Sequence, residues 1–409
     1  MLKVLYTSYD GTLEPLGKSQ IIPYLKELSK YNIKYILLSY EKKSYLKKKE
    51  DINELKKFLK SNNIKWKGLR YHKSPTLPAT LFDISIGILY GIWCILFEKI
   101  KIVHSRSYVT ALIALFLKKI FNVKFIFDMR GLWVDERVDG NLWKKESKLY
   151  KIGKIFEKFY LLNADEIVTL TQKSKEVIKN FPYMKDNNTP ITVIPTCTDL
   201  EIFHTDKSGN IPDKFKQKLQ NRFVVTYIGS LGTWYMINEM IDFFKVLKQK
   251  KENSCFLILT KDDPNELINI LNKKNIDPQD YIINFVPYNQ VPEWLKYTDI
   301  GIFFCKICFS KIGSCATKMG EYLACGVPVI FSTGIGDSDD IIKDNNVGYI
   351  INDFTQEEYE KALLNIINLI ENDKDLKKRC YNLAYNYFNL QLGVKKYLEI
   401  YKRLGLNYF

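Results

Sequence analysis

The stretch that decides the fold is FVVTYIGSLGTWYMINEMIDFFKVLKQK, residues 223–250. It opens with an apolar, β-branched run over residues 223–228 that is typical of a buried strand. The glycine turn Gly229–Trp234 follows, and apolar residues then recur at helical spacing over residues 237–250. A strand, a glycine turn and a helix in this order predict a βα unit of a parallel sheet.

The same alternation extends along most of the chain. In the first half we expect strands at residues 3–6, 35–39, 100–104, 124–128, 166–170 and 192–195. In the second half we expect strands at residues 223–228, 255–260, 281–285, 300–304, 328–331 and 348–351. Because 409 residues exceed what one hydrophobic core usually serves, we predict an α/β fold of two doubly wound, Rossmann-like domains facing across a cleft.

A polar stretch, HTDKSGNIPDKF at residues 204–215, sets the predicted domain boundary. We expect an N-terminal domain over residues 1–205 and a C-terminal domain over residues 206–390. Residues 391–409 are predicted to form a helix that packs back on the N-terminal domain.

Positive charge is concentrated in the first half of the chain. Residues 1–200 hold 35 Lys and Arg against 20 Asp and Glu, whereas the remainder holds 26 of each. This asymmetry indicates an anionic partner for the first half, such as lipid headgroups, a polyprenyl-diphosphate acceptor or nucleic acid. A solvated lysine-rich surface without any partner explains the same counts.

The eight cysteines and one long apolar run bear on the compartment. Cys305 and Cys308 form a lone C-x-x-C, and no second pair stands at zinc-site spacing, so we expect buried free thiols in a cytoplasmic protein and no metal. Residues 84–97 (ISIGILYGIWCILF) are apolar on all sides but short of a bilayer span. We expect a buried helix, with docking at a membrane interface as the alternative.

Two glycine turns follow predicted strands and could meet phosphate. Gly17-Lys18-Ser19 ends like a P-loop, but the glycine that this motif needs six positions before the lysine is Thr12, so we reject a P-loop. The turn Gly229–Trp234 is the stronger candidate, because a strand, a glycine turn and a helix present free amides to an anion. Ser230 and Thr233 add hydroxyl donors to it.

The most specific segment is SCATKMGEYLACGVPVI, residues 314–330. Lys318 and Glu321 are three apart and hence share one face of a short helix. Ser314 and Thr317 lie near its start, where amides point outward. A carboxylate here can accept two ribose hydroxyls while Lys318 neutralises phosphate charge.

Residues 321–330 resemble the donor-site signature of family 4 glycosyltransferases, which have the GT-B fold. The family pattern has two glutamates separated by seven residues, then Ala, a small residue, Gly and Pro-Val. Glu321 matches the second glutamate, which holds the ribose in the family, whereas the first falls on Gly313 and is missing. Lys318 lies in a variant similar to the Thr-Lys-x-x-Glu-Tyr-Leu-Ala form of some bacterial surface-polysaccharide transferases.

Other segments resemble the family in the same order along nearly the whole chain. Residues 9–20 resemble its first-strand loop over the donor phosphates, which assigns Gly17 and Lys18 to the donor. Residues 193–203 resemble its interdomain stretch. The turn at Gly229 matches its glycine loop but lacks the usual Arg and Lys. Donor phosphate recognition is therefore expected to be atypical, and a cytidylyl monophosphate donor stays open.

Candidate acceptor residues follow two strands of the first half. Asp128, Arg130 and Glu136 follow the strand at residues 124–128 and emerge at the predicted cleft, as do His104 and Arg106 after another strand. Asp128 could orient an acceptor hydroxyl and Arg130 could offset phosphate charge. A loop-capping ion-pair network is the alternative for these residues.

The resemblance implies an N-terminal acceptor domain, a C-terminal nucleotide-sugar domain and transfer with retention of configuration, without metal or other cofactor. The predicted catalytic residues are Asp128, Arg130, Glu136 and Lys318. The expected partners are a nucleotide-sugar donor, a glycan or polyprenyl-linked acceptor and anionic membrane at the inner face of the plasma membrane, with no nucleic acid. A nucleotide-sugar epimerase of the same fold and an idle nucleotide- or glycan-binding subunit are the alternatives.

Overall fold

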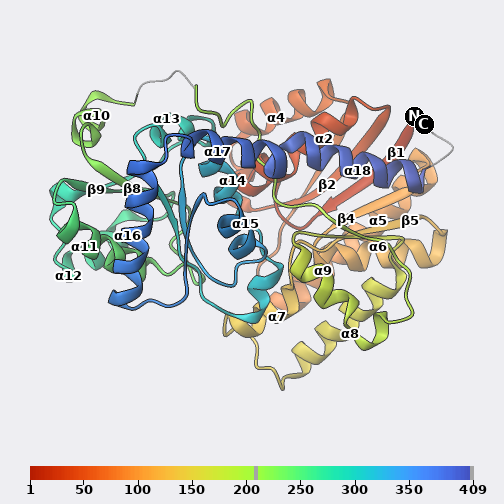
Figure 1. Ribbon diagram of the computed structural model, residues 1–409. Coiled ribbons are helices and arrows are strands. Elements are labelled where there is room, and N and C mark those ends of the chain that lie inside the picture. The colour runs from red at the N-terminus through yellow and green to blue at the C-terminus, as the bar shows by residue number, and fades with distance from the viewer. Residues whose placement is uncertain (207–210, 406–409) are drawn as a thin grey trace. The chain divides into compact units, whose positions relative to one another are not determined.

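The computed structural model describes residues 1–206 and 211–405 (Figure 1). Residues 207–210 of the predicted boundary stretch and residues 406–409 of the predicted C-terminal helix lie outside the described residues. The chain divides into two compact units. The first unit holds Met1–Pro195, Ile312–Ser314 and Leu390–Phe409, and the second unit holds Thr196–Lys311 and Cys315–Asn389.

The first unit contains a seven-stranded parallel sheet in the order β3-β2-β1-β4-β5-β6-β7. Its strands are β1 (Leu2–Ser8), β2 (Ile33–Glu41), β3 (Ile64–Arg70), β4 (Ile102–Arg106), β5 (Lys124–Asp128), β6 (Glu166–Thr169) and β7 (Ile191–Val193). Its helices are α1 (Pro15–Gln20), α2 (Ile22–Ser29), α3 (Lys43–Leu46), α4 (Lys49–Ser61), α5 (Thr76–Glu98), α6 (Tyr108–Phe121), α7 (Trp133–Asp139), α8 (Lys148–Asn163), α9 (Gln172–Lys179), η1 (Pro182–Met184) and α18 (Leu390–Leu404).

The second unit contains a six-stranded parallel sheet in the order β10-β9-β8-β11-β12-β13. Its strands are β8 (Phe223–Ile228), β9 (Ser254–Leu259), β10 (Tyr281–Asn284), β11 (Ile300–Phe303), β12 (Val329–Ser332) and β13 (Gly348–Ile351). Its helices are α10 (Asp213–Leu219), α11 (Ile237–Lys250), α12 (Pro264–Lys273), η2 (Pro278–Asp280), η3 (Tyr288–Gln290), α13 (Val291–Leu295), α14 (Thr317–Ala324), α15 (Ser338–Asp344), α16 (Gln356–Asn372), α17 (Leu376–Leu383) and the π-helix η5 (Ala384–Phe388), while η4 (Phe309–Gly313) runs from the second unit into the first.

The order of strands reverses once in each sheet, and this reversal positions the candidate site. In the first unit the chain leaves β1 toward β2 on one side and places β4 on the other. In the second unit the same reversal occurs between β8 and β11. Ligands of doubly wound sheets bind beyond the carboxyl ends of the strands at such a reversal. The two parallel sheets confirm the predicted α/β class of two Rossmann-like domains.

Two expectations from the sequence were wrong. The strand β3 was missed because it is an edge strand whose sequence, IKWKGLR, alternates apolar residues with lysines and is mostly exposed. The apolar segment predicted at residues 84–97 is part of α5, which begins at Thr76 and has 23 residues. By length and composition α5 could cross a membrane, and only 28% of its most apolar window is buried. The argument that this segment is too short to span therefore fails.

Candidate functional site

In the second unit, the glycine turn directly follows β8 at the strand reversal. Gly229 has a φ of +143°, a conformation that favours glycine, and its amide donates to the Leu259 carbonyl at 3.0 Å. The Tyr227 hydroxyl donates to the Ser230 carbonyl at 2.5 Å, and the Leu231 amide donates to Asp262 at 2.6 Å. These bonds fix the turn at the carboxyl end of β8, and two of them engage the amides of Gly229 and Leu231.

Lys318 of α14 reaches this turn from the other side of the reversal. Its side chain is buried, and its Nζ lies 2.9 Å from the position that a β-carbon on Gly229 would take. Three aromatic rings surround the ammonium, with centroids at 4.0 Å for Phe303, 4.6 Å for Tyr235 and 5.4 Å for Tyr227. Ring faces attract a cation, so these rings favour the ammonium form of Lys318 beside the turn.

Glu321 lies one helical turn further along α14, and it is also buried. Burial raises the pKa of Glu321 to about 7, against the opposing effects of Lys318 and the Tyr288 hydroxyl that is hydrogen-bonded to it. Burial also lowers the pKa of Lys318 to about 8, opposed by Glu321. Perturbed titratable pairs of this kind are concentrated at functional sites, although structural ion pairs show them too.

The sequence fixes α14 against the sheet through close contacts. The Tyr322 hydroxyl donates to the Thr226 carbonyl at 2.9 Å and accepts from the Ile228 amide at 3.0 Å, so it ties α14 to the end of β8. A β-carbon on Gly301 would lie 2.6 Å from the Tyr322 ring, so a glycine in β11 is needed for the ring to fit. The helix that carries Lys318 and Glu321 is therefore rigidly placed over β8 and β11.

The remaining predicted donor residues are spread over both units. Thr317 is the first residue of α14, and Ser230 lies in the glycine turn. Ser314 belongs to the first unit.

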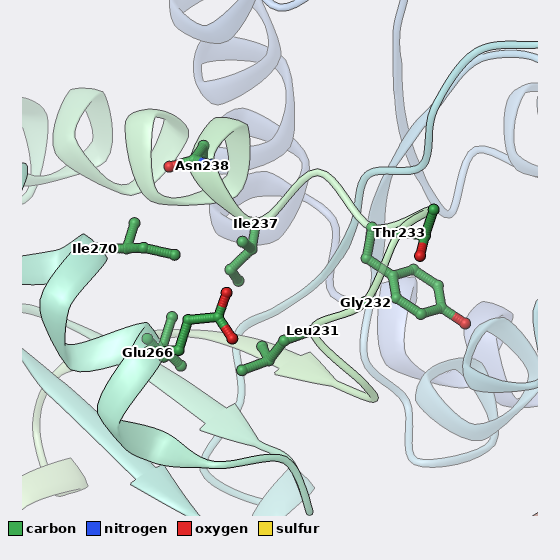
Figure 2. Close-up of a pocket in the computed structure, with 9 residues that line it drawn as sticks. Leu231, Gly232, Thr233, Ile237, Asn238, Glu266 and Ile270 are labelled. Carbon is green, nitrogen blue, oxygen red and sulfur yellow. The ribbon is translucent and has the colours of Figure 1, made fainter. Parts of the chain in front are cut away.

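Thr233 is exposed and lines a hollow of about 200 Å³ beside the turn (Figure 2). Glu266 of α12 extends into the same hollow toward Leu231 (Figure 2). The residues that line this hollow do not include Lys318 or Glu321, so it adjoins the cluster at Gly229 rather than containing it.

In the first unit, the predicted acceptor residues meet at the carboxyl ends of β4 and β5. Asp128 is buried, accepts a 2.7 Å hydrogen bond from the Tyr397 hydroxyl, and lies 3.4 Å from His104 Nε2. Although burial opposes ionisation, the Arg130 guanidinium and His104 lower the pKa of Asp128 to about 2. His104 is buried as well, and its Nδ1 lies 2.5 Å from the Tyr401 hydroxyl. Both side chains thus hold α18 against the sheet through tyrosine hydroxyls of that helix.

The other predicted residues of the first unit surround this cluster. Arg106 ends β4, pairs in register with Asp128, and lies 3.8 Å from Asp10. Gly17 is buried in α1, where a β-carbon would stand 2.3 Å from the Gly11 carbonyl oxygen, whereas Lys18 beside it is exposed. Glu136 is half-buried on α7.

Two polar atoms of the cluster lie near an opposite charge without a hydrogen bond to it. The buried Arg106 Nε and Asp128 Oδ1 have no hydrogen-bond partner among the described residues. Arg106 Nε lies 3.8 Å from Asp10 Oδ2, and Asp128 Oδ1 lies 3.8 Å from the Arg130 guanidinium.

Gly313, where the sequence resemblance places the first glutamate, packs tightly within the first unit. A β-carbon there would lie 3.0 Å from the Leu132 amide nitrogen and 3.3 Å from Gly131 Cα. A longer side chain would require this backbone to move.

Several functional neighbours were missed from the sequence. Lys311 is buried with its Nζ 3.8 Å from the centre of the Trp234 ring, so a second lysine borders the glycine turn. Tyr288 beside Glu321 and the aromatic cage of Lys318 were also missed, because they come from separate elements. The one available signal was the aromatic density around the turn in TYIGSLGTWY, residues 226–235.

Over residues 1–206 and 211–405, no group of three or more His, Cys, Asp or Glu side chains could hold a metal ion. The eight cysteines, all within these ranges, form no disulfide bonds, and most are buried.

Both sheets and the site at the strand reversal define a GT-B fold, and known structures share it. The structure of sucrose-phosphate synthase from Thermosynechococcus elongatus superposes with a TM-score of 0.76 at 12% identity, covering 100% of both chains. HepE of Anabaena in complex with UDP-glucose superposes with a TM-score of 0.69 at 13% identity, covering 98% of this chain and 100% of that chain.

Sequence comparison gives the class of activity. Residues 210–386 match the family model described as glycosyl transferases group 1. The chain is 24% identical over 367 residues to the uncharacterized glycosyltransferase MJ1069 of Methanocaldococcus jannaschii, covering 87% of this chain and 88% of that protein. It is 22% identical over 239 residues to the capsular polysaccharide biosynthesis glycosyltransferase CapM of Staphylococcus aureus, covering 56% of this chain and 58% of that protein. These matches support a glycosyltransferase of GT-B fold.

Proposed function

We propose that this chain transfers a sugar from a nucleotide-sugar donor to a glycan or lipid-linked glycan, with retention of configuration, in the synthesis of a cell-surface polysaccharide. The observation that carries the proposal is the meeting of Gly229, Lys318 and Glu321 at the strand reversal of the second unit. A glycine turn, a caged cation and a carboxylate provide for the phosphates and the ribose of one nucleotide.

The donor class is supported by the structural neighbours and by the geometry of the turn. HepE was solved with UDP-glucose, and CapM is named for capsular polysaccharide synthesis. In this chain the turn itself carries no Lys or Arg. Lys318 and Lys311 border it instead, and two cations suit a diphosphate better than a monophosphate. We therefore assign a UDP-type donor ahead of a cytidylyl donor.

The proposed chemistry depends on placing the reactants and stabilising the departing phosphate. Glu321 accepts the ribose hydroxyls, and amides of the turn other than those of Gly229 and Leu231 bind the diphosphate. Lys318 stabilises the negative charge that develops on the leaving phosphate oxygen. That oxygen takes the proton of the attacking acceptor hydroxyl on the same face of the sugar, so configuration is retained and no metal is required.

We assign acceptor binding to the first unit. Arg106 and Asp128 end adjacent strands there, and each has a buried atom without a hydrogen-bond partner. Asp128, held as a carboxylate by Arg130, can accept a hydrogen bond from a sugar hydroxyl. Arg106 can donate to a phosphate or hydroxyl of a lipid-linked glycan.

Titration calorimetry and thermal shift with UDP, GDP and CMP sugars test the donor assignment. We expect a UDP sugar to raise the unfolding midpoint in proportion to its occupancy and to be consumed slowly in the absence of acceptor. If the chain converts the donor to an isomeric nucleotide sugar, its activity is that of an epimerase and not of a transferase. If the chain binds the donor but does not consume it even in the presence of lipid extracts, it is a binding subunit without catalytic activity.

A further inference from the structure

The helix α5 is apolar on two opposite faces that differ in residue size. One face carries small residues such as Gly87 and Gly91. A β-carbon on Gly87 would lie 2.5 Å from Ile113 of α6, and one on Gly91 would lie 2.5 Å from Leu117. This face is therefore packed into the first unit. The opposite face carries large apolar side chains that are exposed, namely Leu77, Leu81, Leu89, Trp93, Leu96 and Phe97. A helix of a globular domain normally presents polar side chains on such a face.

The exposed apolar surface continues across two neighbouring helices. The helix α6 packs against both α5 and α8, so the three form one layer (Figure 1). Phe116 and Ile120 of α6 are exposed, and so is a row along α8 that includes Ile152, Ile155 and Phe159. Exposed apolar patches of this extent mark interaction sites in soluble domains. We call the exposed apolar side chains of α5, α6 and α8 the apolar platform.

The exposed charges on the three helices of the apolar platform have one sign. The three helices contain the carboxylates Asp83, Glu98 and Glu157. Asp83 is buried against His72 and Tyr9, and Glu157 is buried against Lys154.

Glu98 forms an ion pair with Lys65 at 2.6 Å. The exposed charges of α6 and α8 are lysines, among them Lys119, Lys148, Lys151 and Lys158. The rim of the platform is therefore basic.

Lysines also stand over the aromatic rings at one edge of the platform. Lys65 Nζ lies 4.9 Å from the centre of the Trp93 ring, and Lys67 Nζ lies 5.8 Å from that of Tyr90. Aromatic rings with basic groups beside them are typical of protein surfaces that lie at the level of lipid headgroups.

We propose that the apolar platform rests on an anionic phospholipid surface, with its large apolar side chains among the acyl chains and its lysines at the headgroups. A basic rim favours anionic lipid over a second copy of the same surface, which would bring like charges together. The packed face of α5, with Asp83 bonded to the body of the unit, favours a helix lying in the interface over one that spans the bilayer. This proposal does not depend on the identity of the donor.

Flotation of the full-length chain with vesicles tests the proposal. We expect the chain to float with phosphatidylcholine vesicles that contain phosphatidylglycerol and to bind pure phosphatidylcholine weakly, with binding that falls as salt is raised. Leu89→Ser/Phe97→Ser removes two of the most exposed side chains, at 68% and 69%, and should lower the partition coefficient by about tenfold or more. Lys148→Glu/Lys151→Glu should abolish the preference for phosphatidylglycerol.

The matched control is Phe58→Ser/Leu364→Ser, which removes exposed side chains of α4 and α16 and should bind as wild type. Unchanged unfolding midpoints and circular dichroism spectra show that each variant is folded. Failure of the wild type to float, or equal flotation of the platform variant, would overturn the proposal. Retention in vesicles after an alkaline carbonate wash would assign α5 as a membrane span instead. A dimer in solution that Leu89→Ser/Phe97→Ser dissociates, without vesicle binding, would assign the platform to a second copy.

Discussion

The Lys318 ammonium lies 2.9 Å from the point where a β-carbon on Gly229 would stand. The positive φ of Gly229 and the aromatic cage of Lys318 thus shape the same few ångströms beyond β8. Because the turn itself has no Lys or Arg, its cation comes from a helix that lies almost ninety residues later in the chain.

Gly229→Ala should impair both folding and donor binding. Its φ of +143° is strained for any residue with a β-carbon, and that carbon would displace Lys318. We expect a loss of stability of about 1–3 kcal/mol in chemical denaturation and weaker nucleotide binding. Gly232→Ala is the control, since no atom lies within 4 Å of its β-carbon position. Equal effects of the two changes would contradict the assignment of Gly229.

Lys318→Met should keep the apolar packing of the cage and remove its charge. We expect the affinity for a nucleoside diphosphate to fall by about tenfold or more, because a charge-assisted hydrogen bond is lost, while nucleoside affinity is preserved. Calorimetry with UDP and uridine separates the two. Lys343→Met, an exposed lysine of α15, serves as the control. A similar loss for UDP and uridine would refute the phosphate role.

Glu321→Ala should weaken donor binding strongly, because the ribose loses its carboxylate. Calorimetry should show a larger loss for UDP than for its 2′,3′-dideoxy analogue, which lacks the two hydroxyls. Glu252→Ala changes an exposed glutamate just before β9, at the amino edge of the sheet, and should have no effect. Unchanged donor affinity in Glu321→Ala would remove the basis of the proposed site.

Donor binding should depend on pH through the same two residues. Burial raises the pKa of Glu321 to about 7 and lowers the pKa of Lys318 to about 8. Binding needs the carboxylate, which forms above the first value, and the ammonium, which is lost above the second. Affinity should therefore be greatest between about pH 7 and 8. Glu321→Gln should flatten the acid limb and Lys318→Met the alkaline limb of the calorimetric profile.

The same shifts have opposite consequences for stability. The raised pKa of Glu321 contributes stability that is full below its ordinary value of 4.5 and is lost as pH rises through about 7. The lowered pKa of Lys318 contributes stability that is present above 10.5 and is lost as pH falls through about 8. The stability difference between wild type and Glu321→Gln should thus decrease from pH 4.5 to 7, and a constant difference in urea titrations would contradict the burial of Glu321.

Tyr397→Phe should loosen α18 from the first unit. The change removes the 2.7 Å hydrogen bond to Asp128, which is buried and ionised, so we expect a cost of about 1–3 kcal/mol. Limited proteolysis should cleave the C-terminal segment faster, and the unfolding midpoint should fall. Tyr385→Phe alters an exposed hydroxyl and is the control. Equal protease resistance in both variants would argue against a tie through Asp128.

Much of the fold could be predicted from the sequence, since buried parallel strands are continuous apolar runs. The strands predicted at residues 124–128, 223–228 and 348–351 coincide with β5, β8 and β13. The edge strand β3 was missed because only one of its faces is covered, which leaves a mixed and lysine-rich sequence. Lys318 and Glu321 could be paired from their spacing along a helix. Their burial could not be predicted, because it depends on residues that are distant in the chain.

By itself, the sequence determined the two parallel sheets, the glycine turn after β8 and the short helix that carries Lys318 and Glu321, because periodicity and local turn chemistry act over a few residues. Only the tertiary structure decided that rings from β8, β11 and the following loops enclose Lys318, and that Tyr397 of α18 binds Asp128. It also decided which face of α5 is covered. These contacts join elements far apart in sequence, and their energies depend on burial that no local pattern records.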